Sequence, residues 1–346
     1  MKSAAFVISL DFELFWGVRD HRRLEDVGPR ILGVRQAIPA LLSLFHRRQI
    51  RATWATVGFL FCESREEVLS TLPRRLPAYV RAELSPYAHI AQIGANENDD
   101  PYHFGPSLLN KIAATPGQEI GSHTHSHYYC LEDGQTAEDF EADLQANLRV
   151  ARRRGLILRS LVFPRNQVPR KYLEIAHRVG FTSYRGNPPF WPYSPRGGDP
   201  GLLTRLARGV DSIAPLTGDR CIARPDLFDR RPLNVAASRF LRPITGQSTA
   251  LGRLQLRRIL NEIDQTVHSG GVYHLWWHPH NFGTHLEANM ANLERILDRV
   301  EAWRRLGRME SFTMHEIVAG GEEDHRSEPS SRYPEERYSS RGGGSP

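Results

Sequence analysis

Apolar runs typical of buried strands alternate along this chain with segments that have the periodicity of amphipathic helices. Residues 4–10 form a continuous apolar run, residues 27–48 carry apolar side chains at helical spacing, and residues 50–58 are rich in β-forming residues. We expect Pro39 to kink the helix, because proline lacks the backbone N–H group that a helix uses. A strand, a helix and a second strand in this order make a βαβ unit, in which the strands are parallel. The pattern recurs to about residue 318, so the sequence predicts an α/β fold built on a parallel sheet.

The rest of the chain does not suggest a second folded domain. Residues 62–118 have little periodicity and several prolines, so we interpret them as an insertion in a single barrel. A length of 346 residues suits one α/β barrel. From residue 320 the composition changes to Glu, Arg, Ser, Pro and Gly with almost no apolar side chains. We therefore expect one folded domain over residues 1–319 and a disordered polar tail over residues 320–346.

Polar side chains with catalytic chemistry stand at the ends of several predicted strands. They are Asp11, Glu13, His123, Arg165, Arg185 and His278. In a βα barrel the active site is built at the carboxyl ends of the strands, so we expect these side chains to face one cavity. Their common position indicates an active site more strongly than any one of them does.

Two of these positions have the spacing of metal ligands. If the chain turns from strand into helix near residue 122, His123 and His127 lie at i and i+4 on one face, while His125 points elsewhere. Asp11 and Glu13 are two residues apart in an extended segment, so their carboxylates face the same side. Two neutral imidazoles and one carboxylate bind Zn²⁺ with open coordination positions. Spacing alone does not decide which carboxylate is the ligand.

Residues that bind a substrate are expected on the loops around this cavity. Tyr102 and His103 lie in the insertion, where an aromatic ring on a loop offers a stacking surface for a sugar. Residues 188–199 are rich in Pro and Gly and are expected to form a wall of the cleft that carries Trp191. Together with Arg185, these three side chains are our predicted substrate contacts.

The sequence resembles the NodB-homology polysaccharide deacetylases, most clearly around the three histidines. Residues 119–127 are similar to the second motif of that family, H-[ST]-x-x-H with E-I-G before it, and residues 9–13 are similar to a divergent S-x-D-x-E form of the first motif. Residues 163–165 stand where the third motif has its arginine, although Asn, Gln and Val replace the prolines that usually follow. Residues 275–279 resemble the last motif, which ends on the histidine acting as general acid. The similarity covers most of residues 4–318.

The resemblance implies an irregular (β/α)7 barrel and a metal-dependent hydrolase that removes acetyl groups from N-acetylated sugars. By this match Asp11 is the catalytic base, and Glu13 binds the metal together with His123 and His127. The reverse assignment of the two carboxylates stays open. His278 matches the general acid, and His280, two residues away, competes with it for that role.

The chemistry of amide hydrolysis agrees with these roles. A divalent ion, Zn²⁺ or in its place Co²⁺ or Mn²⁺, would polarise the carbonyl group and activate a water molecule. We expect Asp11 to accept the proton of that water, and Arg165 to keep Asp11 ionised through a charge-assisted hydrogen bond. Protonated His278 would donate to the departing nitrogen.

Charge and cysteine content bear on partners and location. The net charge of +6 comes from arginines spread along the chain without interleaved aromatic residues, so we expect no nucleic-acid binding. A weak attraction to anionic lipid or sugar phosphate stays open. The three cysteines are far apart, and no stretch has the length of a signal sequence core or a membrane span. We predict a cytoplasmic protein, with at most peripheral membrane contact, that acts on a lipid-linked or nucleotide-linked saccharide precursor.

Two other functions stay open. Relatives of this barrel include a deformylase of a lipid-linked amino sugar and allantoinase-like hydrolases of small amides, some of which lack a metal. A non-catalytic glycan-binding barrel is disfavoured, because binding alone does not require two carboxylates and three histidines at one site.

Overall fold

The computed structural model describes residues 3–188, 191–195, 197–198, 201–211, 222–223, 231–246 and 249–319. The tail predicted for residues 320–346 lies outside these residues. None of the helices within the described ranges has the length and apolar character that crossing a bilayer requires.

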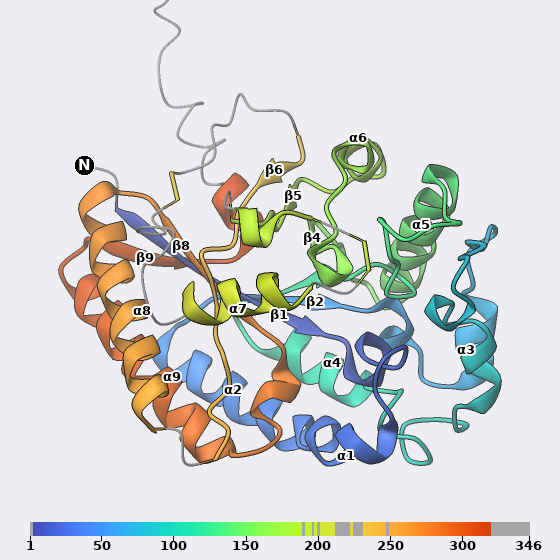
Figure 1. Ribbon diagram of the computed structural model, residues 1–346, viewed down its shortest axis with the longest axis horizontal. Helices are drawn as coiled ribbons and strands as arrows, with labels where there is room; N and C mark the ends of the chain where they lie inside the picture. The colour runs from blue at the N-terminus through green and yellow to red at the C-terminus, as the bar shows by residue number, and fades with distance from the viewer. Residues whose placement is uncertain are drawn as a thin grey trace, which may run out of the picture.

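A parallel sheet forms the centre of the molecule (Figure 1). Its strands are β1 (Ala4–Phe12), β2 (Ala52–Thr56), β3 (Gln118–Ser122), β4 (Ser160–Leu161), β5 (Ser183–Tyr184), β6 (Leu233–Asn234), β7 (Arg239–Phe240), β8 (Val272–Trp277) and β9 (Met309–Phe312). The strand order is β6-β5-β4-β3-β2-β1-β8-β7, and β9 pairs with β1 beside this path. Every strand pair in the sheet is parallel. The predicted α/β class and the irregular barrel type are therefore confirmed, with the curled sheet ending at β6 and β7 in the described part of the chain.

Helices cover the outside of this sheet (Figure 1). They are α1 (Leu24–Leu32), α2 (Val34–Arg48), α3 (Arg65–Ser70), α4 (Pro106–Ala114), α5 (Ala137–Arg153), α6 (Arg170–Arg178), α7 (Leu202–Asp211), α8 (Thr249–Ser269) and α9 (Leu286–Arg305). A capping box fixes the start of α5: the Thr136 side chain accepts a hydrogen bond from the Asp139 N–H group, and the Asp139 side chain accepts one from the Thr136 N–H group.

The helix predicted over residues 27–48 is wrong in one respect. Two helices, α1 and α2, meet at Gly33, and Pro39 lies inside α2 without ending it. A Cβ atom at Gly33 would lie 1.9 Å from the carbonyl oxygen of Gly283, so the break is set by a close approach of two backbones. Apolar periodicity could not reveal it, because the same stripe continues through both helices.

The central strand β1 is buried along its whole length and separates two apolar clusters. Phe6, Ile8 and Leu10 pack in the large cluster under the helices, whereas Ala5 and Val7 belong to a small cluster with side chains of other strands. Because side chains alternate along a strand, Ser9 and Asp11 continue the line of Ala5 and Val7. Asp11 is thereby directed to the inside of the curled sheet.

Candidate active site

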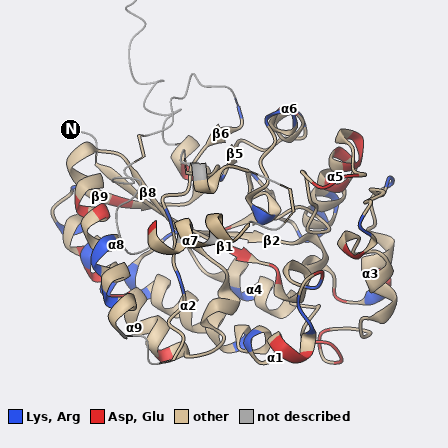
Figure 2. Cartoon of the chain, viewed as in Figure 1, with Lys and Arg blue, Asp and Glu red and all other residues tan. Residues whose placement is uncertain are grey.

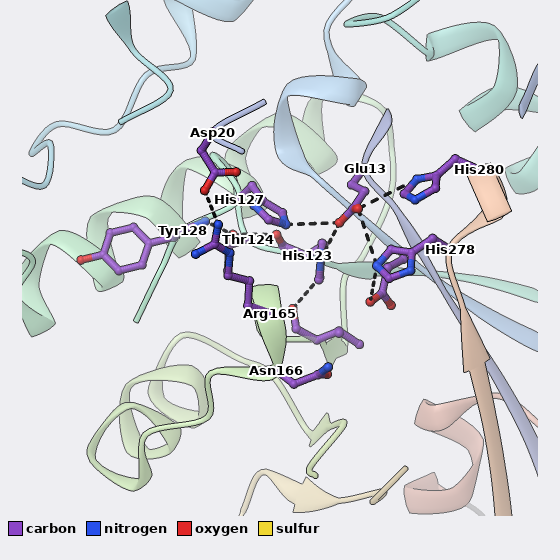
Figure 3. Close-up of polar contacts among 12 residues, drawn as sticks. Glu13, Asp20, His123, Thr124, His127, Tyr128, Arg165, Asn166, His278 and His280 are labelled. Atoms are coloured by element: carbon purple, nitrogen blue, oxygen red, sulfur yellow. Dashed lines mark hydrogen bonds and ion pairs between the residues drawn. The ribbon is translucent and has the colours of Figure 1, made fainter. Parts of the chain in front are cut away.

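Three predicted metal ligands converge at the carboxyl end of β1 and β3 (Figure 3). The Oε2 atom of Glu13 lies 3.4 Å from Nε2 of His123 and 3.2 Å from Nε2 of His127. All three side chains are buried, and their ligand atoms lie within 4.8 Å of one another. A carboxylate and two imidazoles aimed at a common point are the donor set of a catalytic zinc site, so these residues fit a divalent ion.

The two histidines are brought together by a loop, and the predicted helix after β3 is wrong. Residues 123–127 are not helical, and Thr124 and His127 have positive φ angles of 62° and 57°. The carboxylate of Asp143, on α5, accepts hydrogen bonds from the N–H groups of His125 (2.6 Å) and Ser126 (3.1 Å). This anchor holds the loop in a shape that directs the first and last histidine to the same side.

Hydrogen bonding and burial keep the imidazoles ready to bind a cation. Nδ1 of His123 lies 2.9 Å from the Val162 carbonyl oxygen and donates to it, which orients the ring with Nε2 facing Glu13. Burial lowers the pKa of His127 to about 4, although the Glu13 carboxylate opposes this shift. Burial alone would raise the pKa of Glu13, but His278, His123 and His127 together hold it well below its ordinary value.

The arginine that contacts Asp11 is Arg185, so the predicted contact with Arg165 is wrong. Nη1 and Nη2 of Arg185 donate to the two carboxylate oxygens of Asp11 at 2.7 Å and 2.8 Å. Its guanidinium group lies over the ring of Trp276, 4.1 Å from the centroid, and the residue is 1 % exposed. Burial alone would raise the pKa of Asp11, but the charge and hydrogen bonds of Arg185 together with the charges of His123 and His278 outweigh this effect, and the pKa is lowered.

Ser9 and His274 hold Arg185 from behind, a role that the sequence analysis missed. Nη1 of Arg185 donates to Oγ of Ser9 at 3.0 Å, and that hydroxyl lies 2.8 Å from Nε2 of His274. Nδ1 of His274 donates to the Val235 carbonyl oxygen at 2.9 Å, so its Nε2 accepts from Ser9. The signal available in the sequence is a serine two residues before Asp11, together with a histidine inside the apolar run of β8.

Arg165 instead forms part of the cavity wall (Figure 3). It pairs with Asp20 and lies 3.6 Å from a carboxylate oxygen of Glu132, with its guanidinium group 4.3 Å from the centroid of the Tyr129 ring. Arg165 has a positive φ of 54°, and the same conformation at Asn166 turns the chain, so the side chain after β4 points away from Asp11.

Of the two candidate acids, His278 lies closer to both carboxylates. Its Nε2 is 3.8 Å from Asp11 and 3.6 Å from Glu13, and its side chain is 24 % exposed. Nδ1 of His280 is 4.0 Å from Glu13, and its side chain is almost fully buried. Burial, followed by the charge of His278, lowers the pKa of His280 to about 3, so His280 stays neutral and has no proton to donate as a cation.

Two predicted substrate contacts do not reach the cavity. His103 is buried beside Phe15 and Trp16, where Nδ1 lies 2.7 Å from Asp100 and Nε2 lies 2.8 Å from Nε2 of His89. The ring of Tyr102 packs next to Gly28 and against the core. These two predictions are wrong because the insertion folds back onto the short 3-10 helix at Leu14–Gly17. The side chain of Trp191 lies outside the described part of the chain.

A cavity of about 490 Å³ is lined by both carboxylates and by His123, His127, His278 and His280. Its walls include Asn187, Tyr193, Arg239, Phe240, Arg242 and Trp276 in addition to the groups described above. A cavity of this size, with many polar groups and the apolar rings of Phe240 and Trp276, suits a small ligand or one sugar unit of a larger one. Arg185 contributes to it through Asp11, which corrects its predicted role as a direct substrate contact.

Comparisons with known proteins agree with this architecture. No curated protein matches the sequence. The family model for polysaccharide deacetylases matches residues 26–184, which include both candidate histidine ligands but not the carboxylates of β1 or His278. A solved structure from Mycobacterium smegmatis, assigned to the polysaccharide deacetylases, is similar with a TM-score of 0.59 and 12 % identity, over 97 % of this chain and 96 % of the other.

Two further structures show how widely this fold is used. A protein from Pseudomonas aeruginosa PAO1, also assigned to the polysaccharide deacetylases, has a TM-score of 0.51 and 13 % identity, over 94 % of this chain and 92 % of the other. The 4-alpha-glucanotransferase from Thermococcus litoralis has a TM-score of 0.50 and 10 % identity, over 92 % of this chain and 40 % of the other. At such identities the likeness shows the fold alone, because one fold hosts different reactions. The match over residues 26–184, somewhat less than half of the chain, makes this part of the sequence similar to the polysaccharide deacetylases, hydrolases that act on N-acetyl amide bonds.

Proposed function

We propose that this protein removes an N-acetyl group from an amino sugar with the help of a divalent metal ion. The observation that carries the proposal is the convergence, in one cavity, of a Glu13–His123–His127 cluster, an arginine-bound Asp11 and the partly exposed His278. A glycan-binding barrel would not need this combination, because two buried carboxylates and three histidines cost desolvation energy without adding contacts to a neutral sugar.

The ion, for which Zn²⁺ fits the donor set best and Co²⁺ or Mn²⁺ are alternatives, would polarise the acetyl carbonyl and make a bound water molecule more acidic. Glu13, His123 and His127 would hold it. Asp11 accepts a proton from the attacking water, and Arg185 keeps that carboxylate ionised and oriented through its two parallel hydrogen bonds.

His278 donates a proton to the sugar nitrogen as the carbon–nitrogen bond breaks. It lies within 4 Å of both carboxylates and has access to the cavity, whereas His280 is buried and neutral. The products are acetate and the free amino sugar. A formyl group is smaller than acetyl and fits the same chemistry, so the deformylase alternative concerns only the acyl group.

The test is the release of acetate or formate from a panel of N-acylated sugars, both free and linked to nucleotide or lipid. Chelator should abolish release, and added Zn²⁺, Co²⁺ or Mn²⁺ should restore it. Saccharide binding without release of either acid would overturn the proposal.

Metal content tests the division between the two carboxylates. Glu13→Gln should lose stoichiometric metal, whereas Asp11→Asn should keep it and lose about 10²- to 10⁴-fold in kcat, the usual effect of removing a positioned base. If Asp11→Asn strips the metal and Glu13→Gln retains it, the two roles are exchanged.

A further inference from the structure

The helix α7 presents an apolar face to solvent. Leu202, Leu203, Leu206 and Val210 are exposed, and Leu203 is 79 % exposed. They recur at helical spacing, while Thr204 and Asp211 on the same helix are buried. An amphipathic helix in a globular protein normally turns this stripe toward the core, and a contiguous exposed patch of large apolar side chains marks an interaction site.

This helix borders the active-site cavity. The carboxylate of Asp211, at the end of α7, accepts a hydrogen bond of 2.9 Å from the hydroxyl of Tyr193, which lines the cavity. The backbone carbonyl of Asp211 accepts a hydrogen bond from Arg239, a second cavity residue, at 3.3 Å. A partner that binds to α7 would therefore lie close to residues that line the cavity.

The first half of α8 extends the same surface with apolar and cationic side chains. Arg258 of α8 donates to the Asp211 carbonyl oxygen, so the two helices meet (Figure 1). Leu251 and Leu254, which lie two turns and one turn before this contact, are exposed, and so are Arg253 and Arg257. Figure 2 shows blue segments along α8, and no acidic residue occurs in it before the buried Glu262.

We propose that this face, made of α7 and the first half of α8, docks onto an anionic lipid bilayer. Exposed leucines that enter the boundary between headgroups and acyl chains, flanked by arginines that meet anionic headgroups, are the composition of interfacial membrane helices. The net charge of +6 adds a long-range attraction to the same partner. A symmetric pairing of two copies through this face is disfavoured, because it would bring Arg253 and Arg257 of each copy close to the same cations of the other.

Docking in this orientation would place the cavity entrance beside the lipid headgroups. The substrate class that fits is an N-acetylated amino sugar attached to a lipid, presented from the membrane surface. This extension rests on the deacetylase function proposed above, whereas membrane binding itself does not.

The experiment is co-sedimentation of the full chain with vesicles of phosphatidylcholine alone and of phosphatidylcholine mixed with phosphatidylglycerol. The wild-type protein should bind the anionic vesicles, and bind them more weakly in high salt and in the neutral vesicles. Leu203→Ser combined with Leu206→Ser should weaken binding at least tenfold, and so should Arg253→Gln combined with Arg257→Gln. The matched control is Leu306→Ser, since Leu306 is also exposed, 68 %, and lies beyond the end of α9.

Circular dichroism and acetate release from a water-soluble substrate show whether each variant is folded and active. Wild-type protein that does not bind anionic vesicles would overturn the docking proposal, as would a Leu203→Ser, Leu206→Ser variant that binds like Leu306→Ser. A wild-type dimer that the double leucine variant converts to a monomer, without vesicle binding, would assign the face to a second copy. Acetate release from soluble sugar without vesicle binding would leave the proposed function intact and refute only the docking.

Discussion

At the scale of single residues, the site is organised around a buried ion pair whose partners lie far apart in the chain. Asp11 and Arg185 are 174 positions apart, share two hydrogen bonds and are both buried. Ser9 and His274 position the guanidinium group, and burial followed by the charge of Arg185 lowers the pKa of His274 to about 3, so that imidazole stays neutral. A fixed, ionised carboxylate is the form that a general base needs.

We expect Arg185→Lys to impair catalysis more than Arg165→Lys. A lysine ammonium cannot reproduce two parallel hydrogen bonds to a carboxylate, so Asp11 loses its orientation and kcat should fall about 100-fold with metal content retained. Arg165 pairs with Asp20 and Glu132, so its replacement should have a smaller effect on kcat. Steady-state kinetics and metal analysis of both variants provide the measurement. A larger loss of kcat in Arg165→Lys would return the role to the residue that the sequence motif suggested.

At the scale of secondary-structure elements, close backbone contacts decide where helices end. The break between α1 and α2 occurs where Gly33 meets the backbone of Gly283, in the segment that follows the 3-10 helix at Pro279–Phe282. The contact ties the start of the chain to the strand end that carries His278. Local helix preference does not register such a contact, because it depends on a segment about 250 residues away.

Gly33→Ala should destabilise the fold by about 1–3 kcal/mol, because the new Cβ atom forces two backbones apart. The matched control is Gly252→Ala within α8, where a Cβ atom would meet nothing within 4 Å. That change should stabilise the protein by roughly 0.5–1 kcal/mol, since alanine favours a helix more than glycine does. Urea denaturation of the two variants gives the free energies of unfolding. If both substitutions change the free energy of unfolding by the same amount and in the same direction, the backbones at Gly33 and Gly283 can move apart without destabilising the fold.

At the scale of the whole molecule, ion pairs connect loops that follow different strands. Asp20, after the 3-10 helix that follows β1, pairs with Arg165 after β4, and its carboxylate also accepts a hydrogen bond from His21 at 2.8 Å. Burial alone would raise the pKa of Asp20, but His21 and Arg165 lower it to about 2. The side chain is 1 % exposed, so solvent screens this pair little.

The pair makes stability depend on pH in a defined direction. Because the folded protein holds the Asp20 pKa below its unfolded value, the stabilisation is fully present above about pH 4 and is lost as the pH falls toward 2. The free energy of unfolding of Asp20→Asn should therefore be about 2 kcal/mol lower than that of wild type at pH 7. At pH 3 this difference should be smaller by about 1 kcal/mol. Urea denaturation at both values measures this, with exposed Asp133→Asn as the control. A gap that is the same at both pH values would mean that Asp20 is not held ionised by these partners.

The sequence by itself determined the fold class and most of the chemistry. Strand and helix patterns are local, because a helix must bury one apolar stripe and a central strand both of its faces, whatever their neighbours are. The spacing of Asp11 with Glu13 and of His123 with His127 is likewise contained in a short stretch of sequence. Tertiary structure decided which arginine meets Asp11, which strand supplies Ser9 with a partner, and how the histidine loop turns without a helix. Those outcomes depend on strand register and on long-range contacts such as the hydrogen bond from the His125 N–H group to Asp143. Packing across the sheet sets both, and no short stretch of sequence contains them.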